Sequence, residues 1–240
     1  MNEKIRTFLY KHGYDNSLIQ RVWITLMTPF ISYNKKKRSK NVNQKGNELL
    51  DVLMSLSKKN NVIIWPEFGT LLGAYRNKSF ISYDPDIDMG VFAEDFTDTL
   101  MVAIEELGVS KHRCMYLVNK GTKEKRLVEL TLNYKGLLFD LFLSDRIDSH
   151  TRRVYVSYSK ISEIDNKYKV KYYTIDYNND NEKICINGQN LSFPGNVNNY
   201  LESIYGKDYM TPIKGWIPPK YNPIMTYLDN NVYFVEEERF

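Results

Sequence analysis

The sequence is poor in the residues that hold soft metals or cross-link a chain. It has two cysteines, Cys114 and Cys185, which stand far apart with no C-x-x-C pattern, and only three histidines among 240 residues. A zinc knuckle and a disulfide framework are therefore not expected. Unpaired thiols are typical of a reducing compartment, so we expect a cytoplasmic protein.

Long apolar runs are also absent. The most apolar stretch, residues 22–32, is interrupted by Thr25, Thr28 and Pro29. It is shorter than the roughly 20 apolar residues that a membrane helix needs. The first residues lead into an amphipathic stretch without the apolar core of a signal peptide, so we expect neither a spanning helix nor a leader. The net charge of +4 is too small to demand nucleic acid, and no nucleic-acid partner is expected.

Hydrophobic residues make up 42% of the chain, which is enough for a sizeable core. Apolar spacing predicts helices over residues 4–33 and 47–58. Between them lies a basic run that contains Lys35, Lys36, Lys37, Arg38 and Lys40. The run is either a solvated loop, as most charge runs are, or a contact for phosphate, anionic lipid or an anionic polymer. We expect a helical extension over residues 1–45 and a catalytic domain over residues 46–240.

The second part of the chain alternates strand and helix signals. Residues 62–65 read as a buried strand, residues 71–76 as a short helix and residues 86–91 as a strand with apolar residues on one side. A helix is predicted over residues 95–107 and another from Val197. Residues 127–134 and 137–143 form a predicted hairpin around Lys135-Gly136, and the tail from Pro212 is expected to be extended.

Two carboxylates share one face of a predicted strand. In the segment Asp86-Ile87-Asp88, the acids are two residues apart, so both side chains leave the same side. Like charges at this spacing repel unless a cation joins them, and carboxylate oxygens suit Mg²⁺ or Mn²⁺. The alternative is an exposed turn, because a D-x-D pair alone has low specificity.

A third acid, Asp140, lies in the otherwise apolar segment 137–143. A carboxylate there is costly unless it is paired or bound to metal. If this strand lies beside the strand of Asp86 and Asp88, three carboxylates converge on a metal. The alternative is a buried salt bridge to an arginine, for which the candidates are Arg76, Arg126 and Arg146.

A phosphate site is predicted just upstream, where Gly69-Thr70 closes one strand and opens a helix. Glycine lets backbone N–H groups approach a phosphate, and the N-terminus of a helix favours its charge. The order of Gly-Thr, a short helix, D-x-D and a later single acid resembles the nucleotidyltransferase superfamily.

Longer motifs narrow this resemblance. The segments FGTLLGAYR at residues 68–76 and FISYDPDIDMG at residues 80–90 look like the signature of the LicD family, and YGKDYMTP at residues 205–212 resembles its closing motif. That family includes phosphocholine transferases of bacterial surface glycans, fukutin and fukutin-related proteins. Two positions depart from its pattern: Pro85 replaces a frequent acid, and Arg76 is followed by Asn77 in place of histidine.

The resemblance implies an α+β fold with a nucleotidyltransferase-like mixed sheet flanked by helices. It also implies transfer of a phospho-alkyl or phospho-polyol group from a CDP-linked donor to a sugar hydroxyl of a surface glycan or capsule, with release of CMP. The acceptor would be lipid-linked or polymeric, and the basic run around Lys35 and Lys40 would allow peripheral membrane contact. The alternative function is addition of NMP to RNA, protein or a small molecule.

Roles for individual residues follow from the same resemblance. Asp86, Asp88 and Asp140 map onto the metal ligands, with Asp140 alternatively the base and Asp84 a supporting candidate for acceptor contact or base. For substrate binding, the resemblance implies that Gly69 and Thr70 cradle the donor phosphate. Arg76 would pair with phosphate, with Glu67 orienting it. Lys207 would reach phosphate from the last helix. The alternatives are a salt bridge from Arg76 to Asp84 or Glu67, and a plain surface position for Lys207.

Overall fold

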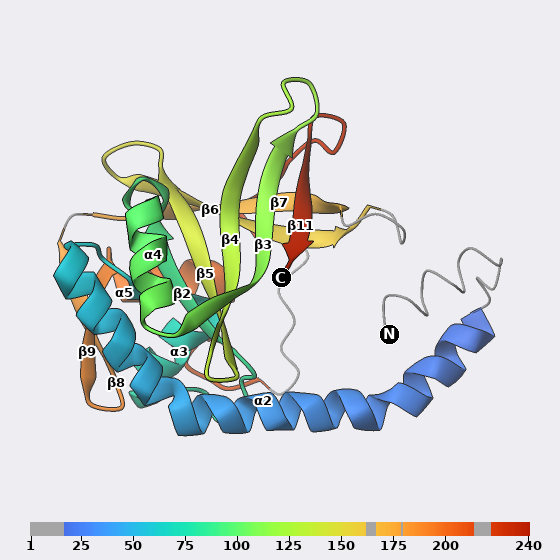
Figure 1. Ribbon diagram of the computed structural model, residues 1–240, viewed down its shortest axis with the longest axis horizontal. Helices are drawn as coiled ribbons and strands as arrows, with labels where there is room; N and C mark the ends of the chain where they lie inside the picture. The colour runs from blue at the N-terminus through green and yellow to red at the C-terminus, as the bar shows by residue number, and fades with distance from the viewer. Residues whose placement is uncertain (1–16, 162–166, 179, 214–221) are drawn as a thin grey trace.

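A long helix lies along one side of a large sheet in the computed structural model, which describes residues 17–161, 167–178, 180–213 and 222–240 (Figure 1). The sheet is mostly antiparallel and the helices are few, so the predicted α+β class is confirmed. Among the described residues, no helix is both long enough and apolar enough to cross a membrane.

The long helix α2 (Ser17–Asn60) is continuous through the basic run. The prediction of a loop at residues 34–40 is therefore wrong. One face of α2 carries a buried stripe at helical spacing, formed by Ser39, Val42, Leu49, Leu53 and Leu56. The lysines occupy the exposed face of the same helix, so their charge does not interrupt it. The part of the first predicted helix before residue 17 lies outside the described residues.

Within the described residues, the sheet has nine strands and closes on itself. β6 pairs with both β5 and β7, and β11 pairs with both β7 and β3, so the path through β4 returns to β5. Its strands are β1 (Trp65–Pro66), β2 (Ile87–Phe92), β3 (Val109–Asn119), β4 (Lys125–Tyr134), β5 (Leu137–Arg146), β6 (Thr151–Lys160), β7 (Lys167–Asp176), β10 (Met225–Tyr227) and β11 (Tyr233–Arg239).

Two predictions about this sheet meet different outcomes. The hairpin of β4 and β5 is confirmed, with Lys135 and Gly136 both at positive φ, 51° and 83°, as a two-residue turn requires. The tail was predicted only as extended, yet β11 closes the barrel-like ring with Val235 in its interior. Its partner β3 lies far away in the sequence, so no local pattern reveals the pairing.

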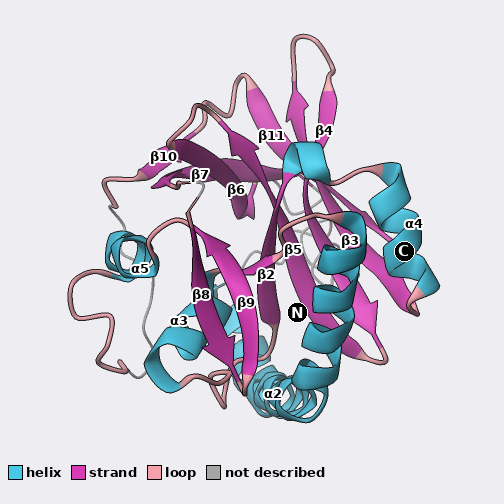
Figure 2. Cartoon of the chain, turned by 90° about the vertical axis from the view of Figure 1, so that its left-hand side faces the viewer, coloured by secondary structure: helices cyan, strands magenta, loops and turns pink. Residues whose placement is uncertain are grey.

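The remaining elements cover the sheet at one end. They are α3 (Phe68–Asn77), the 3₁₀ turn η1 (Ala93–Asp95), α4 (Asp98–Glu106), α5 (Val197–Tyr205) and the hairpin of β8 (Asn181–Ile186) and β9 (Gln189–Pro194). Thr97 and Asn196 cap α4 and α5 by accepting backbone N–H bonds. Figure 2 shows the β8–β9 hairpin beside α2, where Gln189 donates a hydrogen bond to Asp51.

Candidate active site

Two of the predicted acids face each other across a pair of parallel strands. β2 and β5 pair so that Asp88 lies opposite Asp140, with Ile87 opposite Phe139 and Met89 opposite Leu141. Those four apolar residues are buried. Because side chains alternate along both strands, the two carboxylates leave the same face of the sheet. The predicted juxtaposition of the two acidic strands is present.

The loop before β2 carries two more acids, Asp84 and Asp86, and Asp84 lies close to Asp88. A methyl group built on Gly69 would lie 2.6 Å from Oδ2 of Asp84 and 3.8 Å from Oδ2 of Asp88. Both carboxylates therefore point at the first turn of α3. A side chain at this position would push the carboxylate of Asp84 from its place.

The start of α3 is fastened to β2 by two hydrogen bonds. The backbone N–H of Asp88 donates to Oγ1 of Thr70 over 2.8 Å, and the backbone N–H of Glu67 donates to the carbonyl of Asp88 over 2.9 Å. Thr70 is itself buried. Its hydroxyl oxygen thus holds the acidic strand in place, and a contact of Gly69 and Thr70 with phosphate stays a prediction.

The carboxylates load the site with negative charge. Burial raises the pKa of Asp88 well above its ordinary value, and the charges of Asp86, Asp140 and Asp84 raise it further. Burial and the neighbouring charge of Asp86 raise the pKa of Asp84 to about 7. Burial also raises the pKa of Asp140, although the hydrogen bond from Thr131 and the charge of Arg113 oppose this. Such a cluster favours bound cations.

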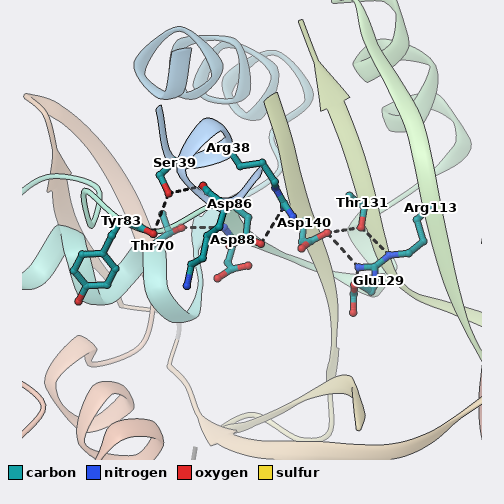
Figure 3. Close-up of polar contacts among 11 residues, drawn as sticks. Arg38, Ser39, Thr70, Tyr83, Asp86, Asp88, Arg113, Glu129, Thr131 and Asp140 are labelled. Carbon is teal, nitrogen blue, oxygen red and sulfur yellow. Dashed lines mark hydrogen bonds and ion pairs between the residues drawn. The ribbon is translucent and has the colours of Figure 1, made fainter. Parts of the chain in front are cut away.

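Two arginines approach the acids from opposite sides (Figure 3). Nη2 of Arg38, on α2, lies 3.2 Å from Oδ2 of Asp86. Arg113, on β3, donates to Oγ1 of Thr131 over 2.9 Å and lies 3.5 Å from Oδ1 of Asp140. The same guanidinium binds Glu129, whose pKa burial and the charge of Asp140 raise to about 7.

Sequence reasoning did not find these two arginines. Arg38 shares the helical spacing that leads through Val42 to the buried leucines of α2, so its inward position could have been recognised. Arg113 had no such signal, because its place depends on the register of β3 against β4, which is irregular between Lys111 and Arg113.

The predicted alternative for Asp140 named the wrong arginines. Arg126 pairs with Asp145 and Arg146 with Glu94, while Arg76 lies 3.4 Å from the carbonyl of Thr211. The residue within reach of Asp140 is Arg113.

Glu67 does not orient Arg76, which corrects the prediction for that residue. Its carboxylate is fully buried and accepts two hydrogen bonds from Arg152 at 3.0 Å, one from Tyr200 and one from Trp65. Every one of these partners is a side chain of the core. Glu67 therefore anchors the start of α3 within the core of the fold.

A cavity of about 970 Å³ opens beside the acids. Its polar lining includes Asp84, Asp88 and Arg76, and its apolar lining comes from all sides, with Phe68, Leu72, Ile81, Phe142, Val156, Tyr173, Ile204 and Tyr205 among the residues. Lys207 is exposed and does not line it; the following Asp208 and Tyr209 do. The closing motif thus contributes to this cavity, but through residues other than the predicted lysine.

The donor chemistry of the site suits a hard divalent cation. Carboxylate oxygens are the ligands that Mg²⁺ and Mn²⁺ prefer, and the half-buried acids outnumber the two arginines beside them. Within the described ranges, however, no group of three or more His, Cys, Asp or Glu side chains is arranged to hold a metal as it stands. Asp86 and Asp140 are instead engaged by Arg38 and by Thr131 with Arg113.

Comparison with known proteins gives one family. A model described as "LicD/FKTN/FKRP, nucleotidyltransferase domain" matches residues 61–191. Ribitol-5-phosphate transferase FKTN of Mus musculus is 26% identical over 75% of this chain, and its Homo sapiens counterpart is 25% identical over 73%. An uncharacterised protein of Rickettsia prowazekii is 32% identical over 43% of this chain and 40% of its own length. The chain spans only 37% and 36% of the two transferases.

Proposed function

The chain belongs to the LicD/FKTN/FKRP nucleotidyltransferase-domain family, and on that premise we propose that it transfers a phosphate-containing group to a sugar hydroxyl. The group is a phospho-alkyl or phospho-polyol unit, the donor is CDP-linked, and CMP is the leaving product. The activity for which the FKTN relatives are named, transfer of ribitol 5-phosphate, supports a phospho-polyol. The acceptor is a surface glycan or capsule precursor, modified in the cytoplasm.

The observation that carries this proposal is the pairing of Asp88 with Asp140 on parallel strands, next to Asp84. Asp84 and Asp88 line a cavity that is large enough for a nucleotide-linked donor. Asp86, Asp88 and Asp140 would hold Mg²⁺ or Mn²⁺, which supplies charge stabilisation for displacement at phosphorus. Asp84, with its pKa near neutrality, is suited to take the proton of the acceptor hydroxyl.

The remaining residues bind and orient the donor. Arg76 lines the cavity and offers a guanidinium to phosphate oxygens. The first turn of α3 at Gly69 faces the acids, so its N–H groups would meet phosphate there. The apolar walls around Phe142 and Tyr205 exclude water from the donor, which limits hydrolysis.

The direct test incubates the protein with Mg²⁺ and CDP-choline, CDP-glycerol or CDP-ribitol in turn and measures CMP. We expect slow CMP release from one donor, abolished by EDTA and by Asp88→Asn. Asp180→Asn, which removes an exposed acid outside the cavity lining, is the matched control and should retain activity. Pyrophosphate release from a nucleoside triphosphate, with no CMP from any donor, would instead assign nucleotidyl transfer.

A further inference from the structure

A second hollow lies along α2, outside the cavity that holds the acids. It is an open groove of about 1070 Å³. Most of its lining comes from residues 32–44 of α2, and Ser82 and Tyr83 complete it. This stretch of α2 lies outside residues 61–191, which match the family model, whereas Ser82 and Tyr83 lie inside them.

The groove is positively charged. Lys35, Lys36, Lys37 and Lys40 line it and are exposed, and no acidic residue is among its lining. Within the described part of the chain, none of the four forms an ion pair with a carboxylate. Their charges are therefore available to an anionic ligand.

The groove is continuous with the acid-bearing cavity. Lys35 and Tyr83 line both hollows. Ser39 donates a hydrogen bond to the carbonyl of Tyr83, and Asn43 donates one to the carbonyl of Ser82. These bonds fix α2 against the loop that carries Asp84, so a chain lying in the groove ends beside the acids.

The other lining groups suit a carbohydrate better than a bilayer. Gln44 supplies an amide that matches sugar hydroxyls, and Asn41 and Asn43 offer their amide oxygens, since their NH2 groups donate to backbone carbonyls. The rings of Tyr33 and Tyr83 are 65% and 61% exposed and offer flat faces with polar tips. A membrane-docking helix would instead present a broad apolar face opposite its lysines.

We propose that this groove binds an anionic stretch of the glycan acceptor, with phosphate or carboxylate groups against the lysines and sugar rings against the tyrosines. This assignment rests on the proposed function, since it places the acceptor in a groove that adjoins the donor cavity. The lysine-rich face of α2 then selects charged over neutral glycans, and Tyr83 stands where acceptor and donor meet.

The test compares binding of fluorescent dextran sulfate and of neutral dextran by anisotropy. We expect the wild type to bind only the sulfated polymer, and Lys36→Gln/Lys37→Gln/Lys40→Gln to bind it roughly tenfold more weakly, as loss of three exposed charge contacts predicts. The control, Lys58→Gln/Lys59→Gln/Lys123→Gln, removes the same charge from exposed positions outside the groove and should bind as the wild type does. Circular dichroism confirms that both variants fold.

Two further readouts separate the outcomes. Donor hydrolysis to CMP in the absence of acceptor should be equal in the wild type and the groove variant; its absence in the wild type would reject the proposed function. Equal polymer binding by the two triple variants would overturn the groove assignment alone. A groove variant that no longer binds vesicles of phosphatidylcholine with phosphatidylglycerol, but binds dextran sulfate as the wild type does, would overturn the glycan assignment in favour of a membrane surface.

Discussion

At the scale of single residues, the metal-binding role proposed for Asp88 conflicts with the stability of the metal-free fold. Its carboxylate lies half-buried among other acids, and desolvation together with their charges raises its pKa well above the ordinary value. An amide of the same shape removes the like-charge repulsion while keeping the backbone bond to Thr70. Asp88 therefore costs the metal-free fold free energy.

We expect Asp88→Asn to raise the Tm of metal-free protein by about 2–4 °C, the shift that ~1 kcal/mol gives in a chain of this size. The same change should lower CMP release at least about 100-fold. Differential scanning fluorimetry with and without Mn²⁺ measures the first effect. Wild-type protein should gain stability from Mn²⁺ and the variant should not; a variant less stable than the wild type in EDTA would contradict this account.

Arg152 and Glu67 form a buried pair with no exposed surface on either side chain. Arg152→Met leaves Glu67 as an unpaired buried charge, so we expect the free energy of unfolding to fall by about 3–5 kcal/mol in a urea titration. Adding Glu67→Gln to that variant should recover part of the loss. Arg153→Met, at the neighbouring half-buried position, is the control and should cost much less.

At the scale of elements, α2 lies outside the matched family region and contributes a cation to the acidic site inside it. Arg38 lies 3.2 Å from Asp86 and competes with any metal for that carboxylate. We expect Arg38→Gln to tighten Mn²⁺ binding by about 3- to 10-fold, as loss of one nearby charge predicts.

Isothermal titration with Mn²⁺ measures this effect. Lys36→Gln is the matched control, because it removes the same charge from an exposed position on the same helix. Equal Mn²⁺ affinity in Arg38→Gln and the wild type would show that the guanidinium and the metal do not share Asp86.

The elements also show what sequence reasoning can reach. The alternation around Asp86 and Asp88 and the lone acid of an apolar strand sufficed to put Asp88 and Asp140 on strands, because side-chain periodicity is a local property. That these strands are neighbours was a condition of the prediction, and Asp86, predicted on the same strand as Asp88, lies just before β2. The basic run was misread because charge content does not end a helix whose other face is buried. Arg113 and β11 were out of reach, since both depend on pairings between distant segments.

At the scale of the whole molecule, the C-terminal strand decides whether the sheet is a closed ring. Val235 is 1% exposed and packs inside the ring with Met115, Leu117, Val128 and Val170. We expect Val235→Asp to lower the free energy of unfolding by at least about 3 kcal/mol, because it places an unpaired charge in that interior. Val232→Asp, at a position that is 40% exposed, should change it by about 0.5 kcal/mol. Similar urea midpoints for the two variants would argue against a ring closed by β11.

The register of β2 on β5 has a further consequence for folding. A slip of one residue in β2 would turn Asp88 into the apolar core and expose Ile87 on the cavity face, and the same slip in β5 would do so with Asp140 and Phe139. The two strands are parallel and separated in the chain by α4, β3 and β4, so no tight turn can set their alignment. The acids therefore penalise a one-residue slip of either strand. The carboxylates that lower the stability of the finished fold thus help to select the register of its central strand pair as the fold forms.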